Sequence, residues 1–249
     1  MTSNTQLELE MVAQPDETTC GPTCLHALYR YYGEEITVEQ VIKECHTLES
    51  GGTLAVFLAC HALRRGYDAT IYTYNLQVFD PTWFGPLVID IRDRLLRQMA
   101  YKADAMLHIA TRGYLEFIEG GGRLRFADLT TDLIRGYLKR AIPILAGLSA
   151  TYLYQCAREH GPKDDYDDIR GEPSGHFVVL TGYDPAHRNV LIADPLHANP
   201  VSGAHRYSVG IDRAICAILL GVLTHDANLL ILRPRGTAGR RNCAGSHRR

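Results

Sequence analysis

The segment from Gln14 to Leu25 most constrains what this chain can fold into. It reads Gln-Pro-Asp-Glu-Thr-Thr-Cys-Gly-Pro-Thr-Cys-Leu, with a glutamine six residues before Cys20. The Gly-Pro after Cys20 suits entry into a helix, because proline is tolerated in the first turn, where its missing N–H costs nothing. Apolar residues then recur at helical spacing until Gly33, a typical helix stop. The pattern predicts a helix that begins at Cys20.

A cysteine at the start of a helix is a candidate nucleophile. A thiol attacks only as the thiolate, and a helix N-terminus favours negative charge. An amide held beside Cys20, such as that of Gln14, can complete an oxyanion hole with the Cys20 backbone N–H. The plainer alternatives are that Cys20 is a buried packing residue and that Gln14 satisfies loop backbone groups.

Two candidate partner residues lie far along the chain. Residues 175–184 read as a strand that begins with His176, and residues 190–195 read as a second strand that holds Asp194. His176 would be the general base and Asp194 the group that orients it. Their side chains can share a face only if the hairpin loop is odd in length or one strand carries a bulge. Otherwise His176 is an ordinary strand residue and Asp194 a turn starter.

The order Gln, Cys, His, Asp resembles that of the papain-like cysteine peptidases. The closer likeness is to the bacteriocin-processing, double-glycine leader peptidases of bacteria and their stand-alone relatives, over roughly residues 8–75 and 140–235. The resembling segments are Gln14, Cys20-Gly21-Pro22, Tyr31-Tyr32-Gly33, Gly175-His176-Phe177-Val178-Val179 and Ala193-Asp194-Pro195. The resemblance implies that Cys20 is the nucleophile, His176 the base, Asp194 the orienting acid and Gln14 the oxyanion donor. It implies cleavage of a peptide or isopeptide bond, with no cofactor and no metal.

Composition narrows the class of protein. A chain of 249 residues that is 46% hydrophobic is long enough for one sizeable core. The net charge of −2 argues against nucleic-acid binding. The first ten residues lack a signal-peptide pattern, and the longest apolar run, residues 214–223, is too short to cross a bilayer. Seven dispersed cysteines predict reduced thiols. We therefore expect a cytoplasmic enzyme with a peptide or protein substrate and no membrane partner.

The order of predicted elements indicates an α+β, papain-like fold. An N-terminal helical part carries the nucleophile and packs on a mainly antiparallel sheet that carries His176 and Asp194. We expect one peptidase domain over residues 1–235, with a helical insertion at 76–140, and a disordered basic tail at 236–249. The expected helices are 20–33, 37–45, 53–66, 87–99, 103–118, 132–140 and 211–220, and the expected strands are 7–12, 69–74, 142–148, 175–184, 190–195 and 229–233.

Several alternatives stay open. Cys24 lies one turn after Cys20, but the sequence has no paired Cys-x-x-Cys elements, so packing is favoured over a metal or redox site, with His26 on the solvated side. The four aspartates within residues 164–168 form either a solvated loop or an acidic flap that favours cationic substrates. The same thioester chemistry would also allow acyl transfer to an amine, and an inactive peptide-binding relative is the remaining alternative.

Overall fold

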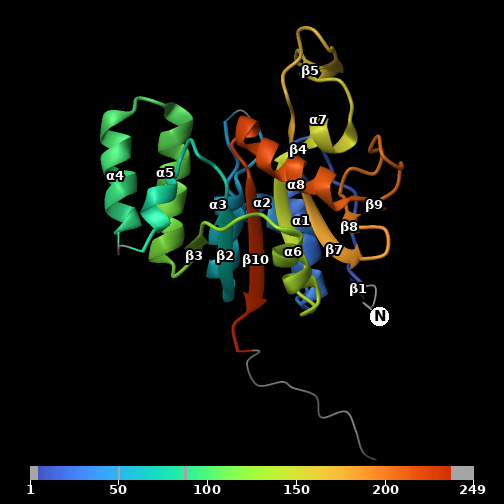
Figure 1. Ribbon diagram of the computed structural model, residues 1–249, viewed down its shortest axis with the longest axis horizontal. Coiled ribbons are helices and arrows are strands. Elements are labelled where there is room, and N and C mark those ends of the chain that lie inside the picture. The colour runs from blue at the N-terminus through green and yellow to red at the C-terminus, as the bar shows by residue number, and fades with distance from the viewer. Residues whose placement is uncertain (1–4, 50, 87–88, 237–249) are drawn as a thin grey trace, which may run out of the picture.

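The computed structural model describes residues 5–49, 51–86 and 89–236. Its centre is an eight-stranded sheet in the order β3-β2-β10-β4-β7-β8-β9, with β1 paired to β7. Helices cover both faces of this sheet (Figure 1). Neighbouring strands run antiparallel except β2 and β3, which are parallel. The predicted α+β class and mainly antiparallel sheet are confirmed. The predicted tail lies, from residue 237 onward, outside the described residues.

The N-terminal elements follow their sequence signals closely. Thr37 Oγ1 accepts a hydrogen bond from Gln40 N at 3.2 Å and so caps the second helix. Gly33 and Gly66, with φ of 83° and 85°, lie just beyond the ends of the first and third. The elements are β1 (Thr5–Gln6), α1 (Cys20–Tyr31), α2 (Val38–Glu44), α3 (Ala55–Arg64) and β2 (Tyr67–Thr73). The prediction of a strand at residues 7–12 was wrong, because the strand that pairs with β7 here is Thr5–Gln6.

The middle of the chain is mostly helical, as its periodicity predicted. Asp90 and Asp104 cap α4 and α5 by accepting backbone N–H groups of their first turns. These two helices stand beside the β3 edge of the sheet (Figure 1). The elements are η1 (Pro81–Phe84), α4 (Ile91–Tyr101), α5 (Ala105–Glu119), β3 (Arg123–Arg125) and α6 (Thr131–Leu138). The helix expected at 87–99 corresponds to α4, and residues 87–88, where it was expected to begin, lie outside the described residues.

The C-terminal part supplies most of the sheet. Its elements are β4 (Ile144–Ser149), α7 (Ala150–Tyr154), β5 (Glu159–His160), β6 (Asp165–Tyr166), β7 (Gly175–Asp184), β8 (Asn189–Ala193), β9 (Arg206–Gly210), α8 (Ile211–Leu220), η2 (Gly221–Thr224) and β10 (Asn228–Pro234). Sequence periodicity did not reveal α7, β9 or the small β5–β6 hairpin. Each is five residues or shorter, so none presents a full period of apolar positions.

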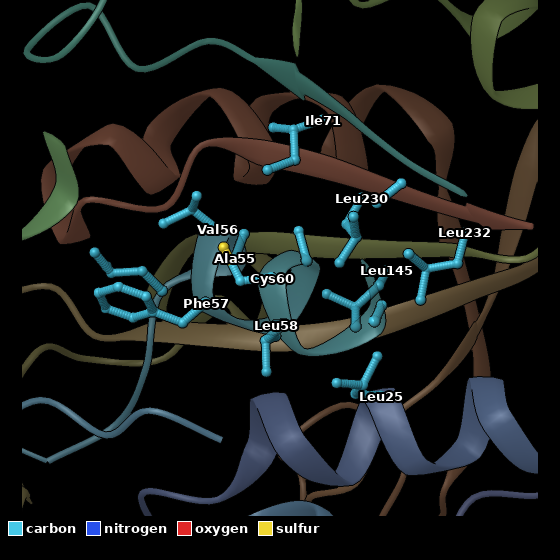
Figure 2. Packing of buried hydrophobic residues seen from close by; sticks show 14 of the residues in the cluster. Leu25, Ala55, Val56, Phe57, Leu58, Cys60, Ile71, Leu145, Leu230 and Leu232 are labelled. Carbon is cyan, nitrogen blue, oxygen red and sulfur yellow. The ribbon is translucent and has the colours of Figure 1, made fainter. Parts of the chain in front are cut away.

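A hydrophobic core lies on each face of the sheet. Phe177 and Val179 of β7 belong to one core, whereas Val178 and Leu180 belong to the other, as the alternation of a strand requires. In the first core, Leu25 of α1 and Leu58 of α3 pack with Leu145 of the sheet (Figure 2). This packing holds α1, and with it Cys20, against the strand that carries His176.

Candidate active site

Cys20 is the first residue of α1 and is buried, with 8% of its surface exposed. The preceding turn is fixed by Asp16, whose Oδ1 accepts hydrogen bonds from the backbone N and Oγ1 of Thr18. Thr19, the N-cap residue, makes no side-chain bond to the helix. The first backbone N–H groups of α1 are therefore left for other acceptors, which is the condition for an oxyanion site at Cys20.

A β-bulge brings His176 and Asp194 to the same face. Asp184 pairs with Asn189 across a four-residue loop, and an even loop alone would put the two side chains on opposite faces. The register shifts between Leu180 and Gly182, so Val179 pairs with Ala193 beyond the bulge. Of the two arrangements that the sequence allowed, odd loop or bulge, the structure has the bulge.

Asp194 is fully buried and accepts hydrogen bonds on both carboxylate oxygens. His176 Nε2 lies 2.9 Å from Asp194 Oδ1, which also accepts from Leu196 N at 2.9 Å. Oδ2 accepts from the hydroxyls of Tyr154 and Tyr207, at 2.8 and 2.6 Å. Burial would raise the pKa of this carboxyl, but His176 and these hydrogen bonds lower it overall. The carboxyl is therefore ionised at neutral pH.

Sequence analysis missed both tyrosines. Tyr154 ends the short helix α7, and Tyr207 lies on β9, so the two elements that carry them were themselves not predicted. Nothing in the sequence around either residue indicates a polar role.

His176 lies between Asp194 and Cys20. Burial by itself lowers the pKa of the imidazole, but the Asp194 carboxylate and Cys20, which both interact with the ring, outweigh it and raise that pKa to about 10. Since Nε2 is bonded to Asp194, Nδ1 is the nitrogen left for the Cys20 sulfur. The imidazole is therefore cationic at neutral pH, and it is a positively charged group that interacts with Cys20.

Gln14 lies in the adjoining loop, and its side-chain Nε2 donates to Asp16 O at 2.9 Å. Its Oε1 is buried and has no hydrogen-bond partner among the described residues. Its backbone N donates to the carbonyl of Pro195, the residue after Asp194, at 3.0 Å. The structure thus joins His176 to Asp194 by a hydrogen bond and to Cys20 by an electrostatic interaction, and it ties Gln14 to the residue after Asp194 through the backbone.

A cleft of about 310 Å³ contains Cys20 and His176. One wall comes from the turn before α1 and the loop before α3, the other from the start of β7 and from Thr224 to Asp226, and Met106 of α5 completes it. Its lining residues are Glu17, Thr18, Cys20, Leu48, Gly51, Gly52, Thr53, Leu54, Met106, Gly175, His176, Phe177, Thr224, His225 and Asp226. A larger hollow of about 800 Å³, between α5 and the α2–α3 loop, contains none of the four predicted site residues.

Several carboxylates lie in the segment between α7 and β7. Asp167 is compensated, since its carboxylate lies 2.6 Å from Arg170 Nε. Glu159 interacts electrostatically with His176, Glu17 and Asp164, and burial, with the neighbouring carboxylates, raises its pKa. Glu17 and Asp164 are thus the carboxylates that interact with Glu159, whereas Asp167 is already compensated by Arg170.

Cys24 is fully buried, with its thiol 3.2 Å from the carbonyl of Phe177, which agrees with the packing role expected for it. The expectation for His26 was wrong. It is buried, and its Nε2 lies 3.2 Å from Ile36 O, because the loop before α2 covers this side of α1.

Among the described residues, no three His, Cys, Asp or Glu side chains are grouped to hold a metal ion. No helix in the described part of the chain is long and apolar enough to cross a membrane.

Comparison with known proteins identifies the class. The model of the Peptidase C39 family matches residues 8–93, and that of the Peptidase C39-like family matches residues 98–213. The crystal structure of a candidate C39-like peptidase from Bacillus anthracis superposes with a TM-score of 0.51 at 13% identity, covering 94% of this chain and 99% of the other. No curated protein matches the sequence.

Two further solved structures are more distant. The peptidase domain of Streptococcus ComA, a bifunctional ABC transporter of a quorum-sensing pathway, gives a TM-score of 0.42 at 13% identity, covering 92% and 100% of the two chains. A double-glycine-motif protease from an AMS/PCAT transporter, in complex with its leader peptide, gives 0.43 at 13% identity, covering 94% and 99%.

The fold is that of the papain-like cysteine peptidases. The chain is similar to the C39 peptidases, since two models of C39 and C39-like peptidases match successive parts of it and together span most of its length. It is accordingly a cysteine peptidase that hydrolyses peptide or isopeptide bonds, as the resemblance implied.

Proposed function

We propose that Cys20, His176 and Asp194 carry out this hydrolysis and that Gln14 and the Cys20 N–H bind the oxyanion. The observation that supports the roles is the position of His176, which contacts Cys20 and lies 2.9 Å from the Asp194 carboxylate. Nucleophile, base and orienting acid thus form one connected series within a cleft.

The reaction follows from these positions. The Cys20 thiolate attacks the substrate carbonyl carbon, and the oxygen takes the negative charge beside the N-terminus of α1. The His176 imidazolium gives its proton to the leaving nitrogen as the C–N bond breaks, which leaves a thioester on Cys20. Neutral His176 then takes a proton from water, whose oxygen attacks the thioester. The acid product leaves and the thiolate–imidazolium pair is restored, while Asp194 stays ionised.

We infer that the substrate is a peptide or protein. The lining of the cleft includes the apolar side chains of Leu48, Leu54 and Met106. It also includes Glu17, with which Glu159 interacts electrostatically. Of these, Met106 belongs to α5, so the helical insertion contributes to substrate access. All six described cysteines are free thiols, which supports a cytoplasmic location.

Trapping the acyl-enzyme tests the assignment. A peptide library is incubated with the protein and quenched in acid, and the adduct is located by mass spectrometry. We expect it on Cys20, and we expect Cys20→Ala to abolish cleavage. Cys24→Ala, a buried cysteine one turn further on, is the matched control and should keep most of the activity. An adduct on another cysteine, or cleavage by Cys20→Ala, contradicts the proposal. Product that forms only with an added amine would indicate acyl transfer instead.

A further inference from the structure

Both oxygens of the Asp194 carboxylate are occupied, yet His176 uses only one of them. Oδ1 accepts from His176 Nε2 and Leu196 N, each at 2.9 Å. Oδ2 accepts from Tyr154 and Tyr207 hydroxyls at 2.8 and 2.6 Å. The residue is 0% exposed, so without the tyrosines Oδ2 would be a buried charged atom with no donor.

The two tyrosines come from different elements that meet at this carboxylate. Tyr154 is the last residue of α7, and Tyr207 is on β9, where it pairs with Ile192 of β8. The backbone of Asp194 is held as well, since His205 O accepts from its N–H at 2.8 Å and His205 Nδ1 lies 2.7 Å from its carbonyl. A carboxylate held this way cannot turn away from His176 without breaking several hydrogen bonds.

We propose that Tyr154 and Tyr207 are positioning residues that keep the Asp194 carboxylate ionised and aimed at His176. The proposal rests on the proposed function of Cys20, His176 and Asp194. Burial, the nearby carboxylate and other neighbouring groups raise the pKa of both phenols well above the usual range, so each hydroxyl keeps its proton and donates a hydrogen bond to Oδ2. Other titratable groups that interact with Asp194 are His176 of β7, Cys24 of α1 and His205, whose Nδ1 contacts the Asp194 carbonyl.

If the tyrosines act through Asp194, their loss must matter only while the carboxylate is there. A hydrogen bond to a charged group is worth about tenfold or more in an equilibrium constant. Without one donor, Asp194 binds a proton more readily or rotates, and the His176 imidazolium loses its partner. The thiolate form of Cys20 becomes less populated as a result.

The test is a double-mutant cycle read out by Cys20 alkylation with iodoacetamide from pH 5 to 8. We expect Tyr154→Phe and Tyr207→Phe each to slow alkylation at pH 6 about tenfold and to lower kcat more than they change KM. The same substitutions in an Asp194→Asn background should change the rate less than twofold. Tyr137→Phe, which removes another buried hydroxyl that is 2.8 Å from Tyr72 Oη, is the matched control and should have no effect on alkylation.

Two outcomes overturn the proposal: unchanged alkylation in both tyrosine variants, or equal losses with and without the Asp194 carboxylate, which would mean a merely structural role. Thermal unfolding of each variant checks that the ring packing is kept. Failure of the proposed function looks different, because His176→Ala would then leave Cys20 alkylation unchanged whatever the tyrosines do.

Discussion

His176 Nε2 lies 2.9 Å from Asp194 Oδ1 because β7 carries one extra residue between Leu180 and Gly182. The four-residue loop that joins β7 to β8 would otherwise put the two side chains on opposite faces of the sheet. The bulge re-aims the N-terminal half of β7, where the base lies, without disturbing the pairing near the loop. Bulges near active sites commonly have this effect.

The first prediction concerns the reactivity of Cys20. Beside the His176 cation it should react with iodoacetamide before any other cysteine at pH 5.5 to 6. Burial raises the pKa of Cys45 and Cys60 to about 12 and that of Cys24 well above its usual range, so these three should stay unlabelled. The order of labelling is read by peptide mass mapping. Cys216, which is exposed, is the internal control, and labelling of Cys216 as fast as Cys20 counts against the assignment.

The second prediction concerns Gln14. Gln14→Ala should lower kcat by about 10²- to 10³-fold if its amide binds the oxyanion, as loss of one such donor does elsewhere. The rate of Cys20 alkylation should stay the same, because that reaction forms no oxyanion. Gln40→Ala, a glutamine on α2, serves as the control. A loss of less than threefold in kcat assigns Gln14 to the loop instead, where it already donates to Asp16 O at 2.9 Å.

Much of this site could be predicted from sequence, and the limits are physical. Cys20, His176 and Asp194 are identifiable because each lies at or next to an end of a regular element with a strong pattern. The contact between His176 and Asp194 could be predicted only on the condition of an odd loop or a bulge. One inserted residue moves the side chains of a strand to the opposite face, and the composition does not reveal it. The roles of Tyr154 and Tyr207 could not be predicted, because the two elements that carry them are too short to show a hydrophobic period. The prediction that His26 faces solvent was wrong because a loop covers its side of α1.

The third prediction is the pH dependence of stability contributed by His176. Its pKa in the folded protein is about 10, above the unfolded value of 6.5. The stabilisation is therefore complete below about pH 6.5 and is lost as the pH rises toward 10. We expect the difference in unfolding free energy between wild type and His176→Gln to shrink by on the order of 2–4 kcal/mol between pH 6 and 10. Urea titrations measure it, with exposed His160→Gln as control. A constant difference contradicts the ion pair.

The fourth prediction concerns Asp226, a buried carboxyl in the wall of the cleft. Its oxygens accept from Ala55 N at 3.1 Å, at the start of α3, and Oδ1 accepts from Asn228 Nδ2 at 2.8 Å. Burial nevertheless raises its pKa to about 7, so the folded state loses stability as the pH rises from about 4 to 7. Asp226→Asn should flatten this part of the pH–stability curve. If wild type and variant keep parallel curves from pH 4 to 8, Asp226 does not titrate in this range.

The last prediction concerns the charge preference of the cleft. Glu17 lines it, and Glu159 interacts with both Glu17 and His176, so a cation near the scissile bond would meet two carboxylates. We expect a preference for peptides with Lys or Arg beside that bond, which weakens as salt shortens the range of the interaction. Glu17→Gln with Glu159→Gln should lower kcat/KM on basic peptides by roughly 3- to 10-fold at low salt and leave neutral peptides nearly unchanged.

Two single variants complete this test. Asp212→Asn removes one negative charge where it faces Arg188 of the β7–β8 loop, at the far end of β7 from His176, and should not alter the preference. Asp167→Asn should also have little effect, since that carboxylate is already compensated by Arg170. If the Glu17 and Glu159 variant keeps its full activity on basic peptides, or if wild type prefers acidic ones, the carboxylates of the rim are solvated surface and selectivity is set by the apolar part of the cleft.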